Sequence, residues 1–300
     1  MSERPTVRPI TLARLIEVTH ACEGESYTTA EVEEALDVSH RRARETILEA
    51  LRIGLVTEHD PDDEDSDPWY LATQVGVEFL KAVRTEDWTR VSDILETRSP
   101  HYNAFLATLE EIAPADLEVV LGELETREEH TGRSYNQTSI EVLGDWGERL
   151  GRIQRNAFTG TYYPVEREEV PLNFAYQLLS VFDNLEETAG VSLRQRYLSI
   201  PELREHFCER VGCPRDPFDE ALVRLAQQNV GRVELSGAPM DTGAKDAQLG
   251  IKSMELAESG GLVSTDQSTE QVMRGVEQFG KQYYYLAVHD RDLSYDPDDD

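Results

Sequence analysis

Lysine is scarce in this sequence: only four of its 29 basic residues are lysine, and all the others are arginine. Acidic residues are abundant, with 59 Asp and Glu and a formal net charge of -30. The acids occur in nearly every block of ten residues and form no single stripe. An even acidic excess with few lysines is typical of a salt-rich cytoplasm, where counter-ions screen carboxylate repulsion. We therefore interpret the charge as adaptation to a halophilic habitat, not as imitation of a nucleic acid.

Cysteine is also rare, and Cys22, Cys208 and Cys213 are too few and odd in number for a disulfide framework. No apolar run is long enough to cross a bilayer. The segment from Met1 to Ile10 lacks the apolar core of a signal peptide. We therefore expect a cytoplasmic protein with no membrane partner.

Catalytic and cofactor motifs are missing as well. The absence of GxxxxGK[ST], GxGxxG and GxSxG argues against a motor ATPase, a dinucleotide enzyme and a serine hydrolase. The tripeptides HAC (20–22) and HFC (206–208) resemble metal ligands, but there is no CxxC pair and half of any zinc site is missing. Buried apolar cysteine is the preferred interpretation. The sequence predicts no enzyme, no cofactor, no metal and no evident small-molecule substrate, with an unrecognised enzymatic pocket as the remote alternative.

The segment 9–84 alternates apolar helical patterns with clear stop signals. A first helix is followed by Thr28 or Thr29 as the N-cap of a short second helix. Asp37 to Ser39 forms a tight turn, a third helix covers 40–53, and Gly54 ends it. Two extended pieces then flank an acidic loop, and a helix over 75–84 closes the segment.

This order, with TTAEVEEALDVSHRRARETILEALRIGLV as its centre, resembles the winged helix-turn-helix family. The resemblance is one of pattern, and the acidic composition marks the chain as of haloarchaeal type. It implies a mainly α fold with small β-hairpins (α+β). It further implies that the third helix enters the DNA major groove while the wing touches the backbone or the minor groove.

The pattern is expected to repeat, which predicts tandem winged helix-turn-helix domains. We place winged helix 1 at 9–98, winged helix 2 at 99–170, a looser winged-helix-like domain at 171–292 and an acidic tail at 293–300. In the second, a helix over about 138–150 precedes a hairpin. In the last, the stretch STEQVMRGVEQFGKQYYYLAVHD predicts a helix followed by a strand of three tyrosines, Tyr283 to Tyr285.

Two clusters are candidate DNA surfaces. The first is the basic run at the start of the third helix, where arginine supplies phosphate and base contacts. It comprises Ser39, His40, Arg41, Arg42, Arg44 and, farther along, Arg52. The alternative is a solvated helix face whose arginines pair with Glu45 and Glu49. The acidic hairpin tip EHDPDDED would repel phosphate, so it either points away from DNA or the domain binds protein.

The second cluster mixes arginine with polar and aromatic residues around the hairpin of winged helix 2, a combination that suits nucleic acid. It comprises Arg133, Asn136, Gln137, Thr138, Arg149, Arg152, Arg155, Asn156 and Tyr162. The alternative is that the tyrosines pack across the hairpin and the arginines pair with neighbouring acids.

The leading hypothesis is a non-enzymatic protein that binds double-stranded DNA in transcription control or another DNA transaction. The alternative is a protein-interaction subunit of a DNA-maintenance or antiviral restriction complex, with a protein partner or a homodimer. The acidic wing favours the second hypothesis and the HRRAR run favours the first.

Overall fold

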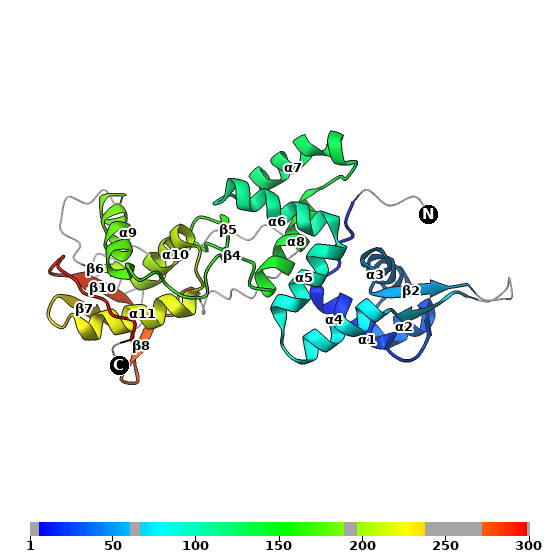
Figure 1. Cartoon of the computed structure of the whole chain (residues 1–300), viewed down its shortest axis with the longest axis horizontal. Coiled ribbons are helices and arrows are strands. Elements are labelled where there is room, and N and C mark those ends of the chain that lie inside the picture. Colours follow the sequence, from blue (N-terminus) through cyan, green and yellow to red (C-terminus); the bar gives the residue numbers. More distant parts are fainter. Residues whose placement is uncertain (1–5, 61–66, 189–196, 238–271, 299–300) are drawn as a thin grey trace. The chain divides into compact units, whose positions relative to one another are not determined.

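The computed structural model describes residues 6–60, 67–188, 197–237 and 272–298 (Figure 1). They form helices and small antiparallel sheets, which confirms the expected α+β mixture. The described residues divide into two compact units, the first ending at Ile153 and the second beginning at Gln154. Within these ranges no helix combines the length and apolarity needed to cross a bilayer.

The first unit starts with three helices and a three-stranded sheet. These are α1 (Leu12–Ala21), β1 (Tyr27–Thr28), α2 (Thr29–Leu36), α3 (His40–Ile53), β2 (Val56–His59) and β3 (Trp69–Ala72). The sheet order is β1-β3-β2, and both strand pairs are antiparallel. Residues 61–66 of the expected acidic hairpin tip lie outside the described residues.

Local sequence fixes the ends of these helices. The Thr28 hydroxyl accepts a hydrogen bond from the Glu31 amide, and the Glu31 carboxylate accepts one from the Thr28 amide at 2.7 Å. This capping box starts α2. Asp37, with a left-handed φ of 49°, ends α2, and the Ser39 side chain caps α3. Gly54 ends α3 with a φ of 81°, as its sequence position predicts.

Five more helices complete the first unit: α4 (Gln74–Arg84), α5 (Trp88–Arg98), α6 (Pro100–Ile112), α7 (Leu117–Thr131) and α8 (Gln137–Arg149). The sequence pattern did not predict α5. The most enclosed of them is α8, because every residue from Ser139 to Gly147 is buried. Trp146 packs edge-on against Tyr102, with ring centroids 5.8 Å apart, and its indole donates to the Ile10 carbonyl at 3.0 Å.

A buried carboxylate connects distant parts of the first unit. Glu49 on α3 is fully buried and pairs with Arg52, whose guanidinium also lies 3.0 Å from His101 Nδ1 on α6. The Arg8 amide donates to the same carboxylate at 3.3 Å. Burying a charge is costly unless it is paired, so Glu49 requires these partners to be in place.

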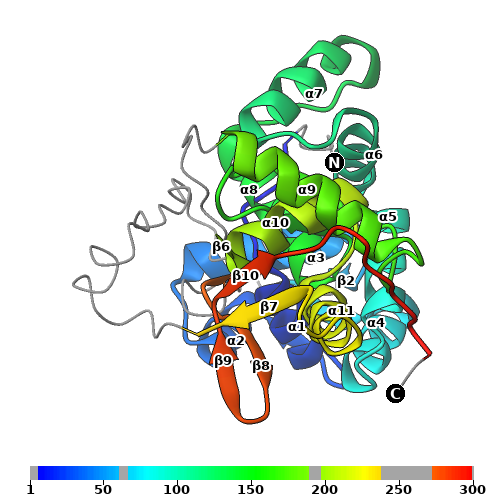
Figure 2. The same ribbon diagram turned by 90° about the vertical axis from the view of Figure 1, so that its left-hand side faces the viewer.

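The second unit begins with a small hairpin and then builds another three-stranded sheet. Its elements are β4 (Ile153–Arg155), which starts at the boundary residue, β5 (Tyr162–Pro164), α9 (Phe174–Thr188), β6 (Tyr197–Ser199), α10 (Ile200–Val211), α11 (Arg215–Gln228), β7 (Val233–Ser236), β8 (Val276–Gln278), β9 (Lys281–Tyr283) and β10 (Tyr285–Val288). The sheet order is β6-β10-β7, again antiparallel (Figure 2). Phe174, Phe207 and Phe218 pack together in its core.

The two units repeat one element order. Three helices with a strand after the first helix, followed by two more sheet strands, occur as α1-β1-α2-α3-β2-β3 and as α9-β6-α10-α11-β7-β10. In the second unit the β8–β9 hairpin is inserted between β7 and β10. In both sheets the last strand lies between the other two. The segment expected to be the second winged helix is divided between the units, because α6, α7 and α8 belong to the first and most of the β4–β5 hairpin to the second. The division into three domains stays a prediction.

The last segment, expected to form a helix and then one tyrosine strand, differs from that expectation. Residues 268–271 lie outside the described residues, and Val276–Gln278 are not helical but form strand β8, which pairs with β9. Phe279 and Gly280 both have positive φ and make the tight turn that converts this stretch into a hairpin. The three tyrosines do not form one strand either, since β9 ends at Tyr283 and β10 begins at Tyr285.

Glycine packing provides a stability test in the first unit. A Cβ at Gly76 would lie 2.1 Å from the Leu55 carbonyl oxygen, whereas a Cβ at Gly122 in α7 would meet nothing within 4 Å. Gly76→Ala should therefore lower the free energy of unfolding by about 1–3 kcal/mol. Gly122→Ala should leave it unchanged or raise it by about 0.5–1 kcal/mol. Urea unfolding at fixed potassium chloride measures both, and equal effects would contradict this packing.

A second prediction concerns Asp219, whose carboxylate pairs with the buried Arg204 at 2.8 Å. Burial raises the Asp219 pKa to about 6, and Arg204 only partly offsets this effect. The native state then holds more protons than the unfolded state between about pH 4 and pH 6. The free energy of unfolding of the wild type, relative to Asp219→Asn, should fall as pH rises from about 4 to 6. Urea unfolding of both proteins across this range tests it, and a constant difference would contradict it.

Candidate nucleic-acid interface

The basic run of the first unit lies at the start of α3. Ser39 accepts a hydrogen bond from the Arg42 amide and so acts as the N-cap. His40 and Arg41 are exposed, and each contacts an acid: His40 Nδ1 lies 3.0 Å from Glu33, and Arg41 Nε lies 3.2 Å from Glu45. The contacts of these two side chains therefore agree with the alternative interpretation, in which this part of α3 is a solvated face whose basic residues pair with acids. The side chains of Glu33 and Glu45 are 38% and 28% exposed.

Arg42 and Arg44 differ in their surroundings. Arg42 donates to the Pro9 carbonyl at 2.9 Å and is half-buried, so it helps to hold the chain that precedes α1. Arg44 is exposed, and among the described residues it makes no hydrogen bond or ion pair. The first turn of α3 contains no acidic residue. Arg41 and Arg44 are therefore the two exposed guanidinium groups near the start of α3.

The polar residues that precede and begin α8 serve that helix. Asn136 caps it by accepting from the Ser139 amide at 2.9 Å, and Gln137 donates to Glu141 at 3.1 Å. Thr138 and Arg133 are half-buried. Because α8 is enclosed, it has no free face resembling that of α3. A helix that reads a groove needs such a face.

The arginines at the end of α8 and just after it also have partners. Arg149 pairs with the buried Asp145 at 2.8 Å. Arg152 pairs with Glu96 at 2.8 Å and reaches Ser92 on the same helix, α5. These contacts support the alternative in which the arginines pair with acids, although those acids come from α5 and α8.

The hairpin residues of the second cluster lie inside the second unit. Asn156 is fully buried, and its side chain bonds to Glu209 and to the amides of Phe158 and Thr159. Tyr162 is also buried, and the Arg155 guanidinium lies 6.0 Å from its ring centroid. This burial argues against direct DNA contact by Asn156 and Tyr162.

A buried ion pair explains why this hairpin is enclosed. Glu205 on α10 is fully buried and accepts from the Arg215 guanidinium and from the Ala157 amide at 3.0 Å. Arg215 also donates to the Arg155 carbonyl at 2.7 Å. The Glu205 partnership raises the pKa of Arg215 despite its burial. The sequence reasoning missed this pair, because ten residues and a helix end separate its members.

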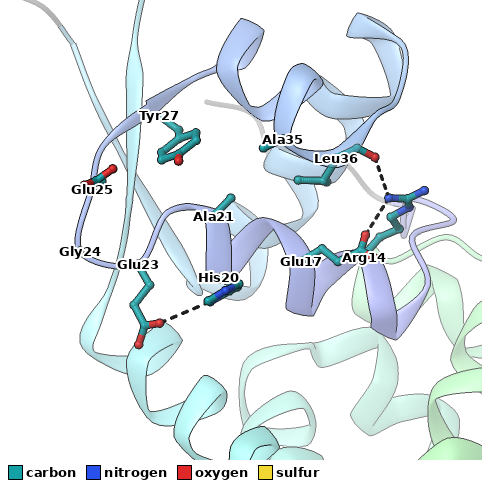
Figure 3. Close-up of a pocket in the computed structure, with 10 residues that line it drawn as sticks. All are labelled: Arg14, Glu17, His20, Ala21, Glu23, Gly24, Glu25, Tyr27, Ala35 and Leu36. Atoms are coloured by element: carbon teal, nitrogen blue, oxygen red, sulfur yellow. Dashed lines mark hydrogen bonds and ion pairs between the residues drawn. The ribbon is translucent and has the colours of Figure 1, made fainter.

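A hollow of about 700 Å³ lies beside α1 and α2, open to solvent (Figure 3). Arg14 donates within it to Glu17 and to the Leu36 carbonyl, and His20 lies 3.6 Å from Glu23. The basic side chains of Arg14 and His20 in this hollow therefore already contact neighbouring protein atoms. Within the described parts of the chain, no group of three or more His, Cys, Asp or Glu residues is arranged to hold a metal ion. We assign no ligand to the hollow.

Comparison with known proteins adds no assignment: no protein-family model matches the chain, and no curated protein matches it significantly.

The Glu205–Arg215 pair is testable by stability measurements. Glu205→Gln leaves a buried guanidinium without its counter-charge, which should lower the free energy of unfolding by about 3–5 kcal/mol. Glu220→Gln removes the same charge from an exposed position on α11 and should change it by less than about 0.5 kcal/mol. Urea unfolding in constant potassium chloride compares them. Equal stability of the two variants would show that the pair does not anchor the hairpin.

Proposed function

We propose that the chain is a tandem winged-helix protein that binds double-stranded DNA through α3 of its first unit. The support for the fold is the element order, found twice, with a three-stranded antiparallel sheet whose last strand is central in each copy. The winged-helix fold and the binding of DNA are separate claims, because a fold does not by itself fix a function.

The observation that carries the DNA proposal is the exposed pair Arg41 and Arg44 on the first two turns of α3. Arg44 has no carboxylate partner among the described residues. Its guanidinium group therefore gains hydrogen-bond acceptors when it meets a phosphate or a base edge. Ser39 and Asp37 define the turn before α3 and fix the angle at which the helix leaves α2. A rigid turn of this kind is what presents a recognition helix to a groove.

The second unit favours another role, as a surface for a protein partner. The corresponding helix α11 exposes Asp216 and Glu220, whose carboxylates repel phosphate. Leu172 and Tyr176 at the start of α9 are 80% and 70% exposed. Large exposed apolar side chains close in sequence are typical of protein contact sites. These exposed side chains of the second unit support the alternative hypothesis, in which the chain is a protein-interaction subunit of a DNA-maintenance or restriction complex.

The DNA proposal is tested by removing the two guanidinium groups together. Arg41→Ala with Arg44→Ala should weaken duplex binding, and should reduce the slope of log affinity against log salt by roughly 1 for each lost phosphate contact. The matched control is Arg90→Ala with Arg98→Ala, which removes the same charge from exposed positions on α5. Fluorescence anisotropy across a potassium chloride titration measures both proteins.

If the two double variants lost the same affinity for duplex DNA, the loss would be due to net charge alone, and the assignment of DNA binding to α3 would be overturned. Absence of duplex binding by the wild type at every salt concentration where circular dichroism shows it folded would overturn DNA binding itself. The protein-partner role would then remain.

A further inference from the structure

Two of the three cysteines meet at the end of α10. Cys208 lies in the last turn of that helix, and Cys213 follows Gly212, which ends the helix with a φ of 69°. The Gly212 and Cys213 amides both donate to the Cys208 carbonyl, at 2.8 and 3.3 Å. This reversal of the chain places the two Sγ atoms 3.9 Å apart. Both cysteines are buried, and Cys208 Sγ also lies 3.5 Å from the Pro214 carbonyl.

The surroundings make the two thiols unequal. Cys213 has a lowered pKa, because Cys208 donates a hydrogen bond to its thiolate and the Arg167 guanidinium contributes positive charge. Burial raises the pKa of Cys208, and the neighbouring Cys213 and Glu205 add to this effect. Cys213 is therefore the nucleophile of the pair, and Cys208 keeps its proton.

We propose that Cys208 and Cys213 form a dithiol site that a small hydroperoxide, such as hydrogen peroxide, oxidises to an intramolecular disulfide. The carrying observation is the close approach of two thiols across a helix end that already folds the chain back on itself. The site is separate from α3 and independent of DNA binding.

The chemistry proceeds in two balanced steps. The Cys213 thiolate attacks one oxygen of hydrogen peroxide, the O–O bond breaks, hydroxide leaves and a sulfenic acid forms. The hydroxide takes up the proton that Cys213 lost and becomes water. The Cys208 sulfur then attacks the Cys213 sulfur, the S–O bond breaks, and the hydroxyl group leaves with the Cys208 proton as a second water. The sulfurs together lose two electrons, and the peroxide gains them.

The protein contains a matched internal control. Cys22 is buried at the end of α1 in the first unit, and burial raises the pKa of its thiol to about 11. No other cysteine lies in that unit, so Cys22 has no resolving thiol within it. It should stay reduced at peroxide concentrations that oxidise the pair.

The experiment treats the folded full-length protein with hydrogen peroxide, then denatures it and alkylates the remaining thiols. Trypsin cleaves after Arg204, Arg210 and Arg215, which puts the two cysteines on separate peptides, 205–210 and 211–215. Mass spectrometry should find these peptides joined, with the loss of two hydrogens, and only Cys22 alkylated. Dithiothreitol should restore all three thiols.

Two variants extend the test. In Cys208→Ala, no cross-linked peptide should form, and Cys213 should be oxidised more slowly than in the wild type, because it loses the hydrogen bond that lowers its pKa. In Cys22→Ala, the joined peptides should form as in the wild type. Three alkylated cysteines at every peroxide concentration that leaves the native circular dichroism unchanged would overturn the proposal. Disulfides that join two copies of the chain, or equal oxidation of Cys22, would also overturn it.

Discussion

Buried pairing of carboxylate with arginine is the interaction on which both units depend. Glu49 holds Arg52 and the Arg8 segment in the first unit, and Glu205 holds Arg215 and the β4–β5 hairpin in the second. Each carboxylate is fully buried, so it is stable only with its partners in place. Arginine suits this task because its planar group donates several hydrogen bonds at once. Because most basic residues of this chain are arginine, most of its basic side chains can form such multiple hydrogen bonds to buried carboxylates.

This use of arginine changes how a basic cluster should be interpreted. Arg149 and Arg152 are close in sequence, but they pair with Asp145 and Glu96. Arg41 also has a carboxylate neighbour, yet it remains exposed, and Arg44 has none among the described residues. Accessibility, not density of positive charge, separates the side chains that can meet a phosphate from those that support the fold.

The repeated element order gives the two units different surfaces on a similar frame. The helix that follows the short second helix is basic at its start in the first unit, where α3 carries Arg41 and Arg44. In the second unit α11 exposes Asp216 and Glu220. A shared arrangement of helices and strands leaves the exposed positions free to vary, because they contribute little to the core. The DNA-binding and partner-binding roles that we propose for the two units rest on this difference in exposed charge.

The sequence alone determined the elements whose signals are local. The Thr28 cap, the turn at Asp37 and the stop at Gly54 lie where the pattern predicts them, because each depends on a few neighbouring residues. It did not reveal that α8 is enclosed, or that Val276–Gln278 pairs with β9. Only the tertiary structure decided these features, together with the Glu205–Arg215 pair and the meeting of Cys208 with Cys213. Burial and contacts across helix ends depend on how elements pack, and spacing along the chain does not specify that packing.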